Sequence, residues 1–88
     1  MPAHGTHADV PPHRVAVVGA SGFTGAELLR LAAAHPHLDV VVATGDSQAG
    51  TAIADLYPSL AAAYPDRSFT SFDPDDLDDV DVVFCGLP

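Results

Sequence analysis

The feature that most constrains the fold of this chain is a set of three glycines spaced three residues apart. The stretch VGASGFTGA, residues 18–26, follows the apolar run VAVV and has glycine at positions 19, 22 and 25. Glycine adopts backbone angles forbidden to other residues, lets a phosphate approach the backbone and lets a helix pack closely on a strand. We therefore expect a strand, a tight turn at Gly19, a helix beginning at Gly22, and close packing at Gly25.

The residues around this turn have the pattern of one strand–helix–strand unit. Residues 14–18 are short, apolar and rich in valine, which predicts a central parallel strand covered on both faces. Leucine and alanine then recur at helical spacing up to Pro36, which predicts a helix of about three turns. Residues 38–44, LDVVVAT, predict a second buried strand, so the unit has the size of one βαβ element.

The second half of the chain has weaker patterns. Residues 51–68 predict short helical pieces interrupted at Pro58 and Pro65, and residues 68–72, SFTSF, predict a short edge strand. The acidic run at 73–79, DPDDLDD, is typical of a solvated loop or a single helical turn, and we predict no metal there because nothing fixes its geometry.

The last residues, 80–88, read VDVVFCGLP and predict a further buried strand that runs into a Gly-Pro turn. We expect Cys85 to be a small buried residue of this strand. The fold class predicted is α/β, the N-terminal portion of a Rossmann-type doubly wound parallel sheet, because such a domain has about six strands. We expect a mobile leader at 1–13 and a partial dinucleotide-binding domain at 14–88, truncated before a catalytic domain.

Composition excludes several classes of function. The formal charge of −9, from 3 basic and 12 acidic residues, opposes binding to nucleic acid or to anionic membranes. One cysteine cannot form an internal disulfide, and no apolar run has the length of a membrane span or the flanks of a signal peptide, so we expect a cytoplasmic protein. His4, His7 and His13 lie on the predicted leader, where no rigid frame would hold a metal, and we predict no metal site.

The glycine turn predicts an anion site. The amides of the first helical turn and the positive end of the helix dipole attract phosphate, and Ser21 and Thr24 add hydroxyl donors. The simpler alternative is a tight turn followed by a helix that Ser21 caps. Because the glycines follow a strand and open a helix, with a second strand at the right distance, dinucleotide binding is favoured. The absence of Gly-Lys-Ser/Thr argues against a kinase or NTPase.

The end of the second predicted strand should meet the adenosine ribose. Asp46 could accept hydrogen bonds from ribose hydroxyls, which would suit NAD, or could be an ordinary turn residue. Thr44, Ser47 and the amides of GDSQAG, residues 45–50, could instead donate to the 2′-phosphate of NADP. Spacing alone leaves the choice between NADP and NAD open.

These residues resemble a known family. The segment VAVVGASGFTGAELLRLAAAHPHLDVVVATGDSQAGT, followed by DLYPSL and DVVFCGLP, is similar to the N-terminal part of the N-acetyl-gamma-glutamyl-phosphate reductases, NADPH-dependent enzymes of arginine biosynthesis. The resemblance covers about residues 14–88 and implies that NADP is the cofactor. It implies that Thr44 and Ser47 lie by the ribose, that Leu87 and Pro88 lie near the nicotinamide, and that the pyrophosphate is lined by Gly19, Ser21, Gly22, Phe23, Thr24 and Gly25. Many members have Arg where this chain has Asp46, which weakens the implication of NADP.

The resemblance also implies what the complete enzyme does. A downstream cysteine would attack a small-molecule acyl phosphate to form a thioester, and hydride from the nicotinamide would release the semialdehyde. The family's cysteine and histidine segments are absent from these residues, so we predict no catalytic residue here, no such role for Cys85, and no activity of this chain alone. The full-length enzyme is expected to be a homo-oligomer. The alternative function is a non-catalytic nucleotide-binding or regulatory module.

Overall fold

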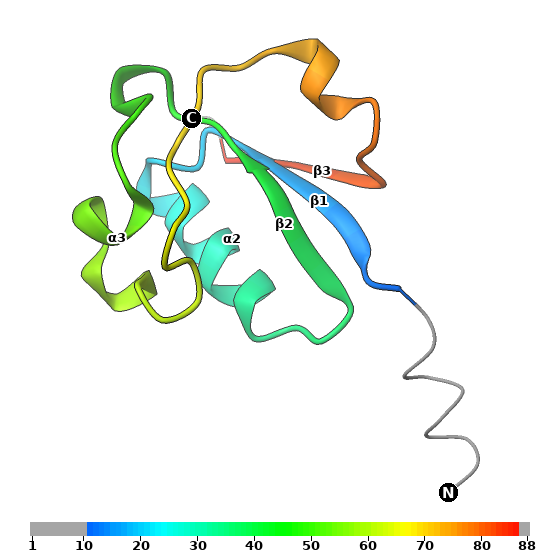
Figure 1. Ribbon diagram of the computed structural model, residues 1–88, viewed down its shortest axis with the longest axis horizontal. Coiled ribbons are helices and arrows are strands. Elements are labelled where there is room, and N and C mark those ends of the chain that lie inside the picture. Colours follow the sequence, from blue (N-terminus) through cyan, green and yellow to red (C-terminus); the bar gives the residue numbers. More distant parts are fainter. Residues whose placement is uncertain (1–10, 87–88) are drawn as a thin grey trace, which may run out of the picture.

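The computed structural model describes residues 11–86 and contains one open sheet of three parallel strands. They are β1 (His13–Val18), β2 (Leu38–Ala43) and β3 (Val82–Cys85), in the spatial order β2-β1-β3. The chain passes from β1 to β2 on one side and then to β3 on the other, so β1 is central (Figure 1). The α/β class and the Rossmann-type sheet predicted from sequence are thereby confirmed.

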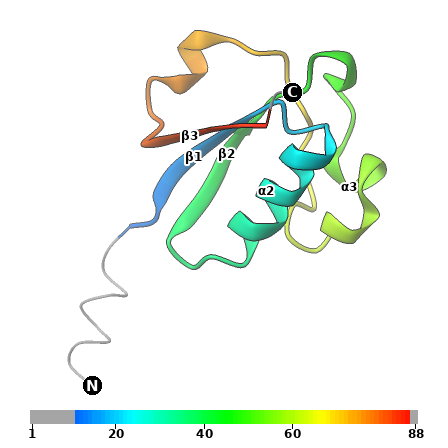
Figure 2. The same ribbon diagram turned by 180° about the vertical axis from the view of Figure 1, so that it is seen from behind.

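The helix α2 (Phe23–Ala33) connects β1 to β2 and covers one face of the sheet, as the apolar spacing predicted (Figure 2). Its buried residues Gly25, Leu29 and Ala32 recur three to four positions apart and face the strands. The helix stops at the cap residue Ala34, two positions before Pro36, because proline cannot continue a helix. The core between α2, the sheet and the following connection contains Val15, Val17, Leu29, Val40, Ile53, Leu60, Tyr64 and Phe69.

The connection after β2 consists of short helical pieces, as expected. They are the 3₁₀ turn η1 (Asp46–Gln48), the single-turn helix α3 (Ile53–Leu56) and the 3₁₀ turn η2 (Pro58–Leu60). Pro58 opens η2, where its missing N–H costs nothing. The α3 and η2 part of this connection packs beside α2, whereas η1 lies just beyond the end of β2 (Figure 1).

The prediction of an edge strand at residues 68–72 is wrong, because only two isolated bridges form there. Thr70 makes one parallel bridge to Thr44 and Ser68 makes one antiparallel bridge to Ala52. The pairing does not extend further because the chain turns toward Pro74, which opens the 3₁₀ turn η3 (Pro74–Leu77). That single turn within the acidic run matches one of the two forms predicted for it.

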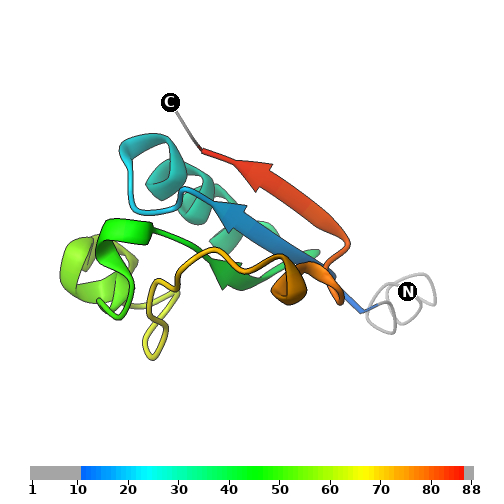
Figure 3. The same cartoon turned by 90° about the horizontal axis from the view of Figure 1, so that it is seen from above.

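The face of the sheet opposite α2 is crossed by the acidic segment that contains η3 (Figure 3). This segment covers β3 only in part, and β3 pairs with β1 alone. Val83 is therefore 44% exposed and Cys85 is exposed, while Val82 and Phe84 pack toward the core. The expectation of a buried last strand with a buried Cys85 is wrong, because the strand lies at an edge.

Among residues 11–86, no helix combines the length and the apolarity that crossing a bilayer requires. His13 begins β1 and is not part of a leader. His4 and His7 lie outside the described residues.

Candidate functional site

The turn after β1 is held by Thr44, the residue that follows β2. Gly19 has a φ of 78°, in the left-handed region that glycine tolerates best. Its N–H donates to Thr44 Oγ1 at 3.1 Å, and the N–H of Ala20 donates to the Thr44 carbonyl oxygen at 2.6 Å. The Thr44 N–H donates in turn to the carbonyl of Val17 at 3.0 Å. These three bonds fix the glycine turn against the end of β2.

The helix α2 begins at Gly22, which is the residue predicted to start it. Gly22 has φ −82° and ψ 174°, and no side chain donates or accepts at this cap. The alternative in which Ser21 caps the helix is therefore wrong. An uncapped helix start leaves amides directed toward whatever lies in front of it, and the helix dipole makes that position favourable for an anion.

Three glycines lie so close to the turn or to its neighbours that a Cβ on any of them would force another atom to shift. A Cβ on Gly25 would lie within 2.7 Å of the Ala20 carbonyl carbon and closer still to the Gly19 carbonyl oxygen. A Cβ on Gly86 would lie 2.9 Å from the Gly25 nitrogen, and one on Gly45 would lie 2.7 Å from Ser21 Oγ. The close helix–strand packing expected at Gly25 is present.

Gly22 differs from these glycines because it has open space around it. The nearest atom to a Cβ at this position would be the Gly19 carbonyl oxygen, at 4.0 Å. Protein packing therefore does not require glycine here. The free space in front of a helix start is what a pyrophosphate would occupy.

A cavity of about 800 Å³ lies where the turn meets the carboxyl ends of the strands. In an open α/β sheet, ligands bind outside these ends, at the point where the strand order reverses, which here is between β1 and β3. The volume lies within the range of roughly 300–1,000 Å³ usual for ligand pockets. The lining residues are Val18, Gly19, Ser21, Gly22, Thr44, Gly45, Asp46, Ser47, Phe72, Leu77, Val83, Cys85 and Gly86.

The residues that line the cavity include both apolar and polar groups, as a dinucleotide requires. The apolar side chains Val18, Leu77 and Val83 line the cavity together with Gly19 and Gly22 of the glycine turn. Asp46 and Ser47, both exposed, lie at the end of β2. An apolar wall suits a planar ring, and a helix start suits phosphate.

The structure brings together part of the predicted site. Gly19, Ser21, Gly22, Thr44 and Ser47 line the cavity. Gly25 is buried behind the turn, while Thr24 is exposed and Phe23 is 89% exposed, and none of these three lines it. Leu87 and Pro88 lie outside the described residues.

Thr44 and most amides of the following loop make hydrogen bonds within the protein. Thr44 is only 2% exposed, and because its hydroxyl oxygen accepts from Gly19, we assign it to holding the turn rather than to contacting the ribose. Most amides of residues 45–50, which could have donated to a 2′-phosphate, donate instead to carbonyl oxygens of the same loop or its neighbour. They are the amides of Gly45, Gln48, Ala49 and Gly50.

Sequence reasoning missed six of the thirteen lining residues: Val18, Phe72, Leu77, Val83, Cys85 and Gly86. The signal for Gly86 and Cys85 was available, since both end a parallel strand, and parallel strands end at one edge of the sheet. Phe72 directly precedes the acidic run at 73–79, and Leu77 lies within that run. The run crosses the face of the sheet opposite α2 (Figure 3), and no local pattern indicates that course.

Comparison with known proteins identifies the relatives of this chain. N-acetyl-gamma-glutamyl-phosphate reductase from Neisseria meningitidis is 48% identical over 75 residues, and that from Acidothermus cellulolyticus is 53% identical over the same length. Each match covers 85% of this chain but only 21% and 22% of the relative. The chain thus spans about a fifth of the length of these curated relatives.

A solved structure and a family match agree with these relatives. Aspartate semialdehyde dehydrogenase from Candida albicans, solved with NADP, matches 88% of this chain and 24% of its own, with a TM-score of 0.76 and 25% identity. The family described as semialdehyde dehydrogenase, NAD binding domain, matches residues 14–88. The strand order, the glycine turn and this match lead to one conclusion: the chain belongs to the semialdehyde dehydrogenase NAD-binding domain family.

Proposed function

We propose that this chain is the dinucleotide-binding part of an N-acetyl-gamma-glutamyl-phosphate reductase, an oxidoreductase of arginine biosynthesis. The observation that carries the proposal is the cavity at the strand ends, where Gly22 leaves open space directly before the first turn of α2. The names of the Neisseria and Acidothermus relatives support the choice of reductase.

Within this proposal the chain binds and orients the cofactor. Gly19, Ser21 and Gly22, with the first-turn amides of α2, lie along the pyrophosphate, and Asp46 and Ser47 lie by the adenosine ribose. When bound, the nicotinamide supplies the hydride that reduces a small-molecule acyl phosphate to a semialdehyde. Phe23 and Thr24 contribute through their backbone, since neither side chain lines the cavity.

NADP is supported as the cofactor by the Candida relative, which was solved with it, and by the hydroxyl of Ser47. NAD is the second candidate, and Asp46 at the end of β2 favours it. The whole reductase is proposed to act in the cytoplasm as a homo-oligomer. The alternative of a non-catalytic regulatory module is disfavoured because the relatives named above are reductases.

Two experiments test the proposal. Fluorescence titration of the protein with NADH and NADPH should show saturable binding of at least one, whereas a folded protein that binds neither contradicts the proposal. In the second experiment, residues 14–88 of this chain replace the matching segment of the Neisseria reductase. This chimera should retain reductase activity. A chimera that folds and binds a dinucleotide but reduces no acyl phosphate would contradict the reductase assignment alone.

A further inference from the structure

We propose that Asp46 makes this site select NAD over NADP. The selected ligand is a dinucleotide whose adenosine ribose has a free 2′-hydroxyl. The inference rests on the proposed function of the cavity and departs from the NADP that the family resemblance implies. Three observations support it: the place of the Asp46 carboxylate, the small number of free donors around it, and the positions of the basic residues.

The Asp46 carboxylate lies at the end of the second strand, where the adenosine ribose is read in dinucleotide folds. Asp46 opens η1 directly after Gly45 and lines the cavity. Its Oδ1 accepts from the Phe72 N–H at 3.4 Å, and the Gly45 N–H donates to the Thr70 carbonyl at 2.9 Å. The loop is therefore tied to the neighbouring segment, with the carboxylate exposed. A carboxylate accepts hydrogen bonds from ribose hydroxyls and cannot donate to a phosphate.

The loop around Asp46 offers few donors to a 2′-phosphate. The Thr44 hydroxyl is buried, and its oxygen accepts from Gly19. Position 45 is a glycine and has no hydroxyl, and a Cβ there would lie 2.7 Å from Ser21 Cβ. Four loop amides already donate to carbonyl oxygens: those of Gly45, Gln48, Ala49 and Gly50. Of the side chains in this loop that line the cavity, only Ser47 presents a hydroxyl to a ligand.

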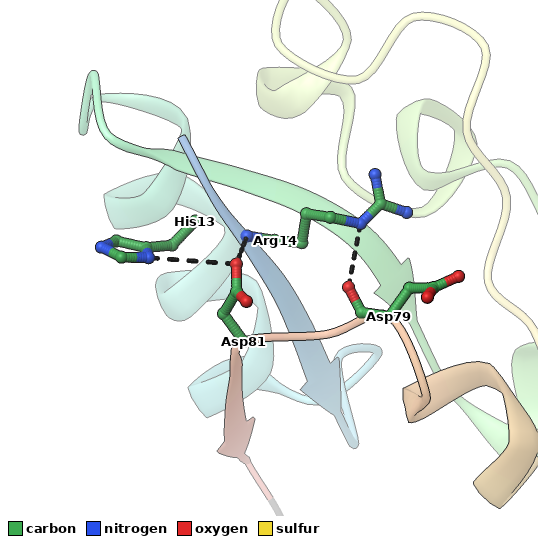
Figure 4. A network of polar contacts seen from close by, with 4 residues as sticks. All are labelled: His13, Arg14, Asp79 and Asp81. Atoms are coloured by element: carbon green, nitrogen blue, oxygen red, sulfur yellow. Dashed lines mark hydrogen bonds and ion pairs between the residues drawn. The ribbon is translucent and has the colours of Figure 1, made fainter. Parts of the chain in front are cut away.

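The basic residues of the chain lie away from the cavity. The chain has three, all arginines. Arg14 lies at the amino end of β1, where its Nε donates to the Asp79 carbonyl at 3.0 Å and its N–H donates to the Asp81 carboxylate at 2.8 Å (Figure 4).

The other two arginines also have partners elsewhere. Arg30 on α2 pairs with Glu27, whose pKa the guanidinium hydrogen bond lowers from its ordinary value, and Arg67 donates to the Val40 carbonyl. Among residues 11–86, no arginine or histidine lines the cavity, and Asp46 is the one charged residue that does.

These observations give the site a preference for NAD over NADP. A 2′-phosphate carries nearly two negative charges and would place them beside Asp46. No cation among residues 11–86 lines the cavity to offset them. The formal charge of −9 adds a repulsive field of the same sign. A free 2′-hydroxyl instead donates to the carboxylate. Selectivity arises both from an attraction for NAD and from a repulsion of NADP.

The test compares the affinities of NADH and NADPH in four versions of the protein, each titrated by fluorescence. The unchanged protein should bind NADPH at least about tenfold more weakly than NADH, because like charges placed together are costly. Asp46→Asn keeps the size and removes the charge, and should bring the two affinities within about threefold. Asp46→Arg should reverse the preference, since a guanidinium binds phosphate with two hydrogen bonds. Asp66→Asn is the control: it changes the net charge by the same amount as Asp46→Asn, at an exposed residue outside the cavity. It should leave the ratio of the two affinities unchanged.

The outcomes separate this inference from the proposed function. If the unchanged protein binds NADPH as tightly as NADH or more tightly, the inference is overturned and the proposed function stands. If Asp46→Asn leaves the ratio as it was, or Asp66→Asn shifts it equally, Asp46 is not the selecting residue. If the folded protein binds neither dinucleotide, the proposed function fails, and the inference fails with it.

Discussion

The hydroxyl of Tyr57 donates a hydrogen bond of 2.6 Å to the carbonyl oxygen of Ser21, 36 residues earlier in the chain. Ser21 belongs to the glycine turn, and Tyr57 lies between α3 and η2. The Ser21 carbonyl and the Gly22 N–H share one planar peptide unit. The bond therefore fixes the direction of the Gly22 amide at the start of α2. In this way Tyr57, which lies outside the cavity, positions Gly22, which lines it.

Removal of this bond should weaken cofactor binding. Tyr57→Phe should raise the dissociation constant of the preferred dinucleotide by about threefold to tenfold and lower stability by about 0.5–1.5 kcal/mol. Tyr64→Phe is the matched control, because its hydroxyl donates at 2.7 Å to the Leu29 carbonyl, away from the cavity. It should lower stability by a similar amount with affinity unchanged. Equal effects of the two variants on affinity would argue against a positioning role for Tyr57.

Thr44 should matter through its hydroxyl rather than through its size. Thr44→Val keeps the shape but leaves the Gly19 N–H without its acceptor, which should cost about 1–3 kcal/mol. Thr44→Ser retains the acceptor and should lose less stability. Urea denaturation of the two variants measures the difference. A valine variant as stable as the serine variant would show that the bond does not hold the turn.

Gly25 should tolerate no side chain. In Gly25→Ala the new methyl would meet backbone atoms of Gly19 and Ala20, which cannot move aside as a flexible side chain would. We expect a loss of at least about 1–3 kcal/mol, seen as a lower urea midpoint. Gly22→Ala should leave the midpoint unchanged, since the nearest atom lies at 4.0 Å. A Gly25→Ala protein as stable as the original would refute the close packing described here.

Stability at alkaline pH should depend on Tyr64. Tyr64 is 6% exposed, and burial raises the pKa of its phenol above the ordinary value of about 10. Above that ordinary value the unfolded chain loses a proton that the folded protein keeps, so stability falls as pH rises toward the higher folded pKa. No lysine titrates in this range, because all three basic residues are arginines. Urea midpoints from pH 8 upward, compared with Tyr64→Phe, test this, and equal slopes above about pH 10 would contradict it.

The sequence predicted the elements whose patterns are local. Residues 14–18, the helix up to Pro36 and the strand at 38–44 each have a period or a breaker that acts within a few residues, and each is present. Two of the three roles expected of the glycines are also confirmed, the left-handed backbone at Gly19 and the close packing at Gly25, because backbone angle and close packing are properties of glycine itself.

What the sequence did not predict depends on contacts between distant segments. Cys85 is exposed because β3 has a neighbour on one side only, and an apolar run reads the same in an edge strand as in a central one. Thr44 bonds to Gly19 across 25 residues, so its hydroxyl looked available when the strand was read alone. Phe72 and Leu77 line the cavity from a segment that has no apolar period.

The central claim is that the open space at Gly22 receives the pyrophosphate, and one titration tests it most directly. The backbone angles at Gly22 suit any residue, so Gly22→Val should fold with a circular dichroism spectrum and a urea midpoint like those of the original protein. Its branched side chain would occupy the space before α2. Fluorescence titration with the preferred dinucleotide should show binding weakened by at least about a hundredfold, with Gly22→Ala intermediate. A folded Gly22→Val protein that binds the dinucleotide with unchanged affinity would contradict the claim.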